Sequence, residues 1–106
     1  MKVMTLCGSL KFKEEMMSIA EKMALKGVCV LTPVYPVLRN YKITEEQLIK
    51  LREAHLKRIE LCDSILVVYV NNYIGNSTNL EIEYAKKLGK EILYYTDFIK
   101  NIDKYV

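Results

Sequence analysis

The sequence predicts an α/β protein built on a small doubly wound (Rossmann-like) parallel sheet, with helices on both faces. Four short apolar runs, rich in β-branched or aromatic residues, alternate with longer amphipathic segments. The short runs are apolar on both faces, which is typical of buried parallel strands. At 106 residues the chain can build one core, so we predict a single domain over residues 1–106.

The four predicted strands cover residues 3–7, 28–33, 64–70 and 91–95, which read VMTLC, VCVLTP, SILVVYV and EILYY. Each pair of consecutive strands is separated by a helical segment, and such crossovers are right-handed in nearly all proteins. Helix cover on both faces then favours the strand order 2-1-3-4.

Three helices are predicted between these strands. In the first, apolar residues recur at helical spacing and Gly27 follows as a stop; they are Met16, Ile19, Ala20 and Met23. The second begins at Thr44, where a capping box with Gln47 is expected, and runs to about Cys62. One of its faces carries Leu48, Leu51, His55 and Ile59.

The third predicted helix covers residues 79–88 and ends at Gly89. Its expected inward residues are Leu80, Tyr84, Ala85 and Leu88. The long connection at residues 33–43 suggests a surface flap, and residues 97–106 form a short terminal element. Tyr35, Tyr41 and Tyr73 lie in the two long loops and could stack on a base.

Composition limits the classes of partner. The chain is 51% apolar and 27% charged, with a net charge of +3 and no basic stripe, so we expect no nucleic-acid polymer as a partner. No run approaches the roughly 18 apolar residues of a membrane span, and the N-terminus does not read as a signal peptide. Three cysteines without a CxxC pair, Cys7, Cys29 and Cys62, indicate reduced core thiols in a cytoplasmic protein.

In an open parallel sheet a ligand binds beyond the carboxyl ends of the strands where the winding reverses, here between the first and third strands. The turn after the first strand carries Gly8, Ser9 and Lys11 before a helix, which suits a phosphate. A plain turn without a ligand is an equal alternative. The loop after the third strand offers a second helix start and hydroxyls for a phosphate or ribose, through Tyr73, Gly75, Asn76, Ser77 and Thr78.

Two further residues have both a structural and a functional interpretation. Thr78 and Glu81 have capping-box spacing, which spacing alone favours, yet Glu81 also lies at the inner edge of its helix, over the cleft. His55 is the single histidine, and on an apolar face it is typically a core residue, although a tilt of its helix could bring it to the cleft. No second histidine or acidic cluster stands at ligand spacing, so no metal site is predicted.

The segments LCGSLK, CDSILVVYV and YIGNSTNLEIEYAKKLGKEILYY together resemble the nucleoside 2-deoxyribosyltransferase superfamily, which includes the deoxynucleoside 5'-monophosphate N-glycosidases. The resemblance implies that Glu81 is a nucleophile on the anomeric carbon of the sugar, without a cofactor. It also implies that Gly8, Ser9 and Lys11 hold a 5'-phosphate, with lysine in place of the more usual arginine. A homodimer or higher homo-oligomer is expected.

Two positions depart from the family pattern. An acidic residue of the N-glycosidases aligns with His55, and a tyrosine of their first strand aligns with Thr5. His55 could act as a general acid, or it could mark lost chemistry. The sequence therefore favours hydrolysis or transfer of the N-glycosidic bond of a nucleoside or nucleoside 5'-monophosphate. The alternatives are a non-catalytic nucleotide-binding module, as a sensor or sequestering protein, and a structural protein with a vestigial cleft.

Overall fold

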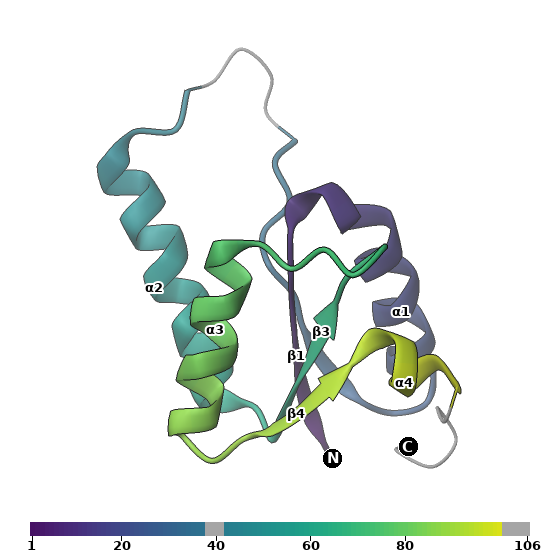
Figure 1. Ribbon diagram of the computed structural model, residues 1–106. Coiled ribbons are helices and arrows are strands. Elements are labelled where there is room, and N and C mark those ends of the chain that lie inside the picture. Colours follow the sequence, from purple (N-terminus) through teal and green to yellow (C-terminus); the bar gives the residue numbers. More distant parts are fainter. Residues whose placement is uncertain (38–41, 101–106) are drawn as a thin grey trace.

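The computed structural model describes residues 1–37 and 42–100, with the backbone alone for residues 97–99. The elements follow the order β1 (Val3–Gly8), the short 3-10 helix η1 (Leu10–Phe12), α1 (Lys13–Leu25), β2 (Cys29–Leu31), α2 (Glu45–Leu61), β3 (Ser64–Val68), α3 (Asn76–Lys87), β4 (Glu91–Tyr94) and α4 (Tyr95–Lys100). The four strands are parallel in the order β2-β1-β3-β4, which confirms the predicted topology (Figure 1).

The longest pairing in the sheet joins the two central strands. β1 and β3 are in register from Met4 opposite Ser64 to Gly8 opposite Val68. A Cβ atom on Gly8 would lie 2.6 Å from the Val68 carbonyl oxygen, so the close approach of the strands at this position requires glycine. The two strands therefore end side by side, at the same edge of the sheet.

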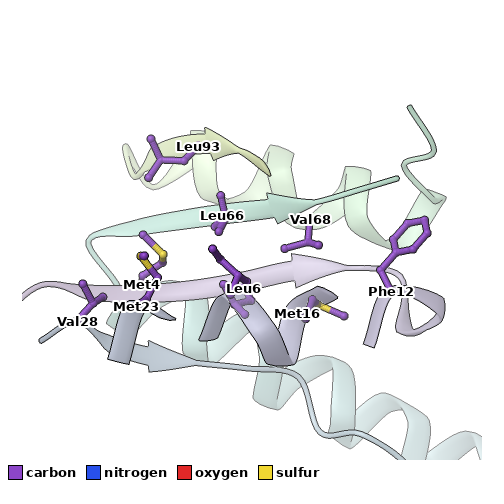
Figure 2. Packing of buried hydrophobic residues seen from close by; sticks show 10 residues of the cluster. Met4, Leu6, Phe12, Met16, Met23, Val28, Leu66, Val68 and Leu93 are labelled. Atoms are coloured by element: carbon purple, nitrogen blue, oxygen red, sulfur yellow. The ribbon is translucent and has the colours of Figure 1, made fainter. Parts of the chain in front are cut away.

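Alternation along the strands divides the core between the two faces of the sheet. Met4 and Leu6 of β1, with Leu66 and Val68 of β3, pack against α1, as Figure 2 shows. The intervening side chains face α2 and α3 and form a second cluster, which consists of Cys7, Ile59, Cys62, Ile65, Val67, Ile82 and Ala85. Helices thus cover both faces, with α1 and α4 on one side and α2 and α3 on the other (Figure 1).

Helix α2 begins with the predicted capping box. The Thr44 hydroxyl accepts from the Gln47 backbone N–H at 3.1 Å, and the Gln47 side chain accepts from the Thr44 N–H at 3.0 Å. The predicted apolar face is only partly correct, because Leu48 and Leu51 are each 39% exposed while His55 and Ile59 are buried. Only the C-terminal half of the helix lies against the sheet, and its first turns extend past it (Figure 1).

Helix α3 differs from the prediction in its start and in its buried face. It begins at Asn76, after Gly75 as N-cap, rather than at residue 79. Its buried residues are Thr78, Ile82 and Ala85, whereas Leu80 is 72% exposed. Leu88, also expected to be buried, is exposed, and Tyr84 is half-buried. The β-branched Thr78 and Ile82 pack against the sheet, so the prediction that the leucines mark the buried face of α3 was wrong.

Other expectations hold in part. Strand β2 is shorter than predicted, and Cys29 on it is half-buried, whereas Cys7 and Cys62 are buried free thiols. The predicted flap is described at residues 33–37 and 42–43; Tyr41 lies outside the described residues, as do residues 101–106 of the tail. Among the helices of the described chain, none combines the length and apolarity needed to cross a bilayer.

Two leucines test the assignment of the core. Leu66 is fully buried in the central strand, whereas Leu25 at the end of α1 is 82% exposed. We expect Leu66→Ala to lower the free energy of unfolding by about 2–5 kcal/mol, because it leaves a cavity beneath α1. The matched change Leu25→Ala should cost less than about 0.5 kcal/mol. Urea denaturation measures both, and equal losses would contradict the packing described.

Candidate active site

A small cavity of about 130 Å³ lies beyond the carboxyl end of β1, next to the point where the direction of winding reverses. Its lining comes from β1, the segment after β2, α2 and α3, and consists of Gly8, Pro33, Val34, Leu51, Arg52, His55, Arg58 and Glu81. The cavity lies at the carboxyl end of the first strand, as predicted, but its other wall comes from the segment after β2 and from α2, and its lining includes no residue of the loop after β3. Of the predicted site residues, it brings together Gly8, His55 and Glu81.

Three side chains from different elements meet at the cavity floor. His55 Nε2 lies 3.4 Å from Glu81 Oε1 and 3.7 Å from Cys7 Sγ. The His55 side chain is 9% exposed and that of Glu81 is 20% exposed. Glu81 is therefore a largely buried carboxylate with neighbouring groups that can donate hydrogen bonds to it, and it still faces the open space of the cavity.

The Cys7 thiol is one of these donors. Burial, and after it the charge and hydrogen bond of Glu81, raises the pKa of the Cys7 thiol well above its usual range. The thiol consequently keeps its proton at neutral pH and donates a hydrogen bond to the Glu81 carboxylate. A thiol in this state is a hydrogen-bond donor and a poor nucleophile.

The Glu81 carboxylate is not explained by helix capping. The N-cap of α3 is Gly75, and Thr78 lies buried inside the first turn, so the predicted capping box between Thr78 and Glu81 does not form. The extra turn at the start of α3 turns Thr78 toward the core. Glu81 instead has its contacts at the cavity floor.

The turn after β1 contacts the turn after β3 through the side chain of Lys11. Ser9 Oγ accepts a hydrogen bond from the Lys11 backbone N–H at 3.3 Å and caps η1, which is a structural role. The Lys11 ammonium lies 3.8 Å from the ring centroid of Tyr73, in a cation–π contact. The edge of the same ring contacts Phe12. Neither Ser9 nor Lys11 lines the cavity.

The remaining predicted residues of the second loop also lie away from the cavity lining. Gly75 caps α3 through its backbone, Asn76 and Ser77 are exposed in the first turn, and Tyr73 is 45% exposed above Gly75. They have no direct contact with Glu81 among the described interactions. The structure thus brings only part of the predicted site together at the cavity, namely Gly8, His55 and Glu81.

Sequence reasoning missed two arginines. Arg52 and Arg58 line the cavity on either side of His55, three residues away in each direction. Within residues 1–37 and 42–100, neither has an ion pair with a carboxylate. The pattern R-x-x-H-x-x-R on α2 was a usable signal, because residues three apart share one face of a helix.

The Cys7, His55 and Glu81 ligand atoms lie within 4.8 Å of one another, a set that could hold zinc. Sequence spacing could not reveal this set, because the three residues come from three elements. One feature opposes a metal there: Arg58 Nη1 lies 3.4 Å from His55 Nδ1, where a metal-bound histidine would carry an N–H. The donors suit a proton-bearing network better than a cation.

Comparison with protein families connects this geometry to a group of proteins. Residues 4–94, which include every strand and the whole cavity floor, match the family described as "Domain of unknown function (DUF4406)". The chain belongs to this family. No curated protein matches the DUF4406 chain.

Two solved structures share the fold of this DUF4406 domain. The 2-desoxiribosyltransferase from Leishmania mexicana superposes with a TM-score of 0.67 and 21% identity, over 90% of this chain and 64% of its own. The Clostridium botulinum CMP N-glycosidase BcmB gives a TM-score of 0.55 at 21% identity, over 97% of this chain and 82% of its own. For the fold, the predicted resemblance to the nucleoside 2-deoxyribosyltransferase superfamily is confirmed.

The raised pKa of Cys7 predicts a loss of stability in alkali. Above about pH 8.5 the thiol loses its proton in the unfolded state but keeps it in the folded state. Deprotonation therefore stabilises the unfolded state alone, and the free energy of unfolding falls by up to about 1.4 kcal/mol per pH unit. We expect Cys7→Ala to show a shallower decline between about pH 8.5 and 10 in urea denaturation. Cys29→Ala, at a half-buried site, is the control, and identical slopes for wild type and Cys7→Ala would refute the assignment.

Proposed function

We propose that this DUF4406 protein cleaves or exchanges the N-glycosidic bond of a nucleoside or nucleoside 5'-monophosphate, with Glu81 as nucleophile and without a cofactor. The observation that carries the proposal is the Glu81 carboxylate, largely buried beside Cys7 and His55 and open to a cavity at the switch point. The names of the two solved proteins that share the fold, a deoxyribosyltransferase and a CMP N-glycosidase, support this reaction class.

In the proposed reaction, Glu81 attacks the anomeric carbon of the sugar as the bond to the base breaks. The base departs with the bonding electron pair and takes up a proton, and a glycosyl ester on Glu81 remains. Water then releases the sugar, or a second base accepts it. Hydrogen bonds from Cys7 and His55 hold the carboxylate in one orientation, which lowers the cost of reaching the attacking geometry.

An anionic substrate fits the charges around the cavity. Arg52 and Arg58 place two cations on its wall, with no carboxylate partner within the described residues. Guanidinium groups bind phosphate through a planar pair of donors. This supports a 5'-monophosphate as substrate over a free nucleoside.

Two loops near the cavity complete the proposed binding site. The turn of Gly8, Ser9 and Lys11 and the loop of Tyr73, Gly75, Asn76 and Ser77 would bind phosphate and ribose, whereas Thr78 is buried against the sheet and is not part of this proposal. To bind the ligand, the Lys11 ammonium would give up part of its cation–π contact with the Tyr73 ring and contact the phosphate instead.

We propose that the protein works in the cytoplasm as a homodimer or higher homo-oligomer. A second, apolar cavity of about 480 Å³ adjoins the first, and the two share Val34 and Leu51. Beside it, the exposed first turns of α2 carry Leu48 and Ile49. A second copy against this surface would enclose the site.

A nucleotide-binding module without turnover is the second candidate, and two residues favour it. His55 stands where the N-glycosidases have an acidic residue. Thr5, where they have a tyrosine, is fully buried and its hydroxyl donates to the Arg58 carbonyl at 2.8 Å. Thr5 thus serves the contact between β1 and α2 and offers nothing to a substrate.

The experiment is incubation of the pure protein with a panel of nucleosides and 5'-monophosphates, with chromatography for free base. We expect base release, faster from a monophosphate, and loss of at least 1,000-fold in rate for Glu81→Gln, because the amide cannot attack the anomeric carbon.

Glu83→Gln is the matched control, since Glu83 is exposed on the same helix and pairs with Lys86. Equal rates for Glu81→Gln and wild type would exclude Glu81 as nucleophile. Binding of a panel member without any base release would favour the module instead.

A further inference from the structure

We propose that Arg58 is a positioning residue that keeps the proton of the neutral His55 ring on Nε2, so that the ring donates a hydrogen bond to Glu81. The tautomer follows from the contact between Arg58 and His55 on α2. The role of this tautomer in catalysis rests on the proposed function. Nothing in the resemblance to known families assigns a role to this arginine.

The direction of the first hydrogen bond is fixed by the chemistry of arginine. Arg58 Nη1 lies 3.4 Å from His55 Nδ1. A guanidinium has N–H donors and no acceptor, so Nδ1 must accept through its lone pair. A proton on Nδ1 would face the Arg58 N–H, and two donors would repel each other. The proton of the neutral ring is therefore on Nε2.

The direction of the second bond follows. Nε2 lies 3.4 Å from Glu81 Oε1 and 3.7 Å from Cys7 Sγ. The ionised carboxylate is a stronger acceptor than a thiol that keeps its own proton. Nε2–H therefore donates to Glu81, and the Cys7 S–H donates to the same carboxylate.

Arg58 is itself held in place by its backbone. The buried Thr5 hydroxyl donates to the Arg58 carbonyl at 2.8 Å and ties this turn of α2 to the central strand. The arginine lies on the same helix as His55, three residues later, so the two side chains share a face. The charged or titratable groups around the ring are Arg52 and Arg58 from α2, Cys7 from β1 and Glu81 from α3.

The two consecutive hydrogen bonds, from Arg58 to His55 and from His55 to Glu81, restrain the Glu81 carboxylate. A hydrogen bond at Oε1 restrains the rotation of the carboxylate group. In this arrangement His55 acts as a neutral donor to the nucleophile, and no lone pair on Nε2 is available to a metal. The acidic residue of the N-glycosidases is thus replaced by a donor held in one tautomer.

The chain contains one histidine, so its ring nitrogens can be observed without assignment ambiguity. We would label the full-length protein with ¹⁵N-histidine and record long-range ¹H–¹⁵N correlation spectra at neutral pH. We expect one tautomer, with Nδ1 unprotonated and shifted as a nitrogen that accepts a hydrogen bond. A protonated Nδ1 in the wild-type protein would overturn the proposal, and this measurement requires no variant.

Two matched variants test the cause. Arg58→Met should move the Nδ1 resonance toward that of a nitrogen without a donor, whereas Arg52→Met, which removes the same charge from the same face, should leave it in place. Addition of Zn²⁺ should leave the Nε2 proton signal unchanged. An unmoved Nδ1 resonance in Arg58→Met, or loss of the Nε2 proton with Zn²⁺, would overturn the proposal.

Kinetics separates this inference from the proposed function. In an active protein we expect Arg58→Met to lower kcat about tenfold and also to raise KM, because the change removes a cation from the cavity wall as well as the donor to His55. Arg58→Lys, which retains a donor, should recover part of the loss in kcat. An unchanged kcat in Arg58→Met would contradict a positioning role. Absence of turnover with the expected tautomer would refute the proposed function and leave the assignment of the proton standing.

Discussion

The pairing of β1 with β3 is the constraint on which the rest of the structure depends. It brings the ends of two strands from distant parts of the sequence to the same edge, and glycine at position 8 permits the closest approach. Alternation along β1 then sends Cys7 toward α2 and α3 while its neighbours face α1. The floor of the cavity is therefore a product of strand register, and a slip by one residue would turn Cys7 away from Glu81.

The environment of Glu81 combines burial with a supply of hydrogen-bond donors. A carboxylate in a largely buried position is costly unless its charge is satisfied. Here a protonated thiol and an imidazole adjoin it, and two arginines line the same cavity. The thiol and the imidazole orient the carboxylate through hydrogen bonds, and the two arginines favour an anionic ligand at the mouth. The hydrogen bonds that make burial of this carboxylate tolerable are thus the same ones that hold it in position for the proposed reaction.

The sequence predicted the sheet, its strand order and the second helix cap, because these depend on local pattern and on general rules of chirality. It did not predict the start of α3, since Gly75 serves as N-cap through its backbone alone, without a side-chain signal. The buried face of that helix was misassigned for a related reason. Leu80 is more apolar than Thr78, yet only the angle at which α3 meets the sheet decides which of them is buried.

The contacts of the candidate site were less predictable than its location. Glu81 and His55 could be named from the sequence, but their meeting with Cys7 depends on the tilt of α2, which no periodicity reveals. Arg52 and Arg58 share a helix face with His55 at a spacing of three residues, a pattern visible in the sequence, but only the tertiary structure shows that this face borders the cavity. The cation–π contact of Lys11 with Tyr73 joins two loops more than 60 residues apart and belongs to tertiary structure alone.

A covalent intermediate on Glu81 is the most direct consequence of the proposed chemistry. The protein would be incubated with a 2-deoxy-2-fluoro nucleoside 5'-monophosphate and quenched with acid, and intact-mass spectrometry would detect the adduct. The electron-withdrawing fluorine slows hydrolysis of the glycosyl ester, so that the adduct accumulates. We expect a mass increase of one glycosyl phosphate, located by peptide mapping on Glu81. Release of base without any adduct, or an adduct on another residue, would contradict the role of Glu81 as nucleophile.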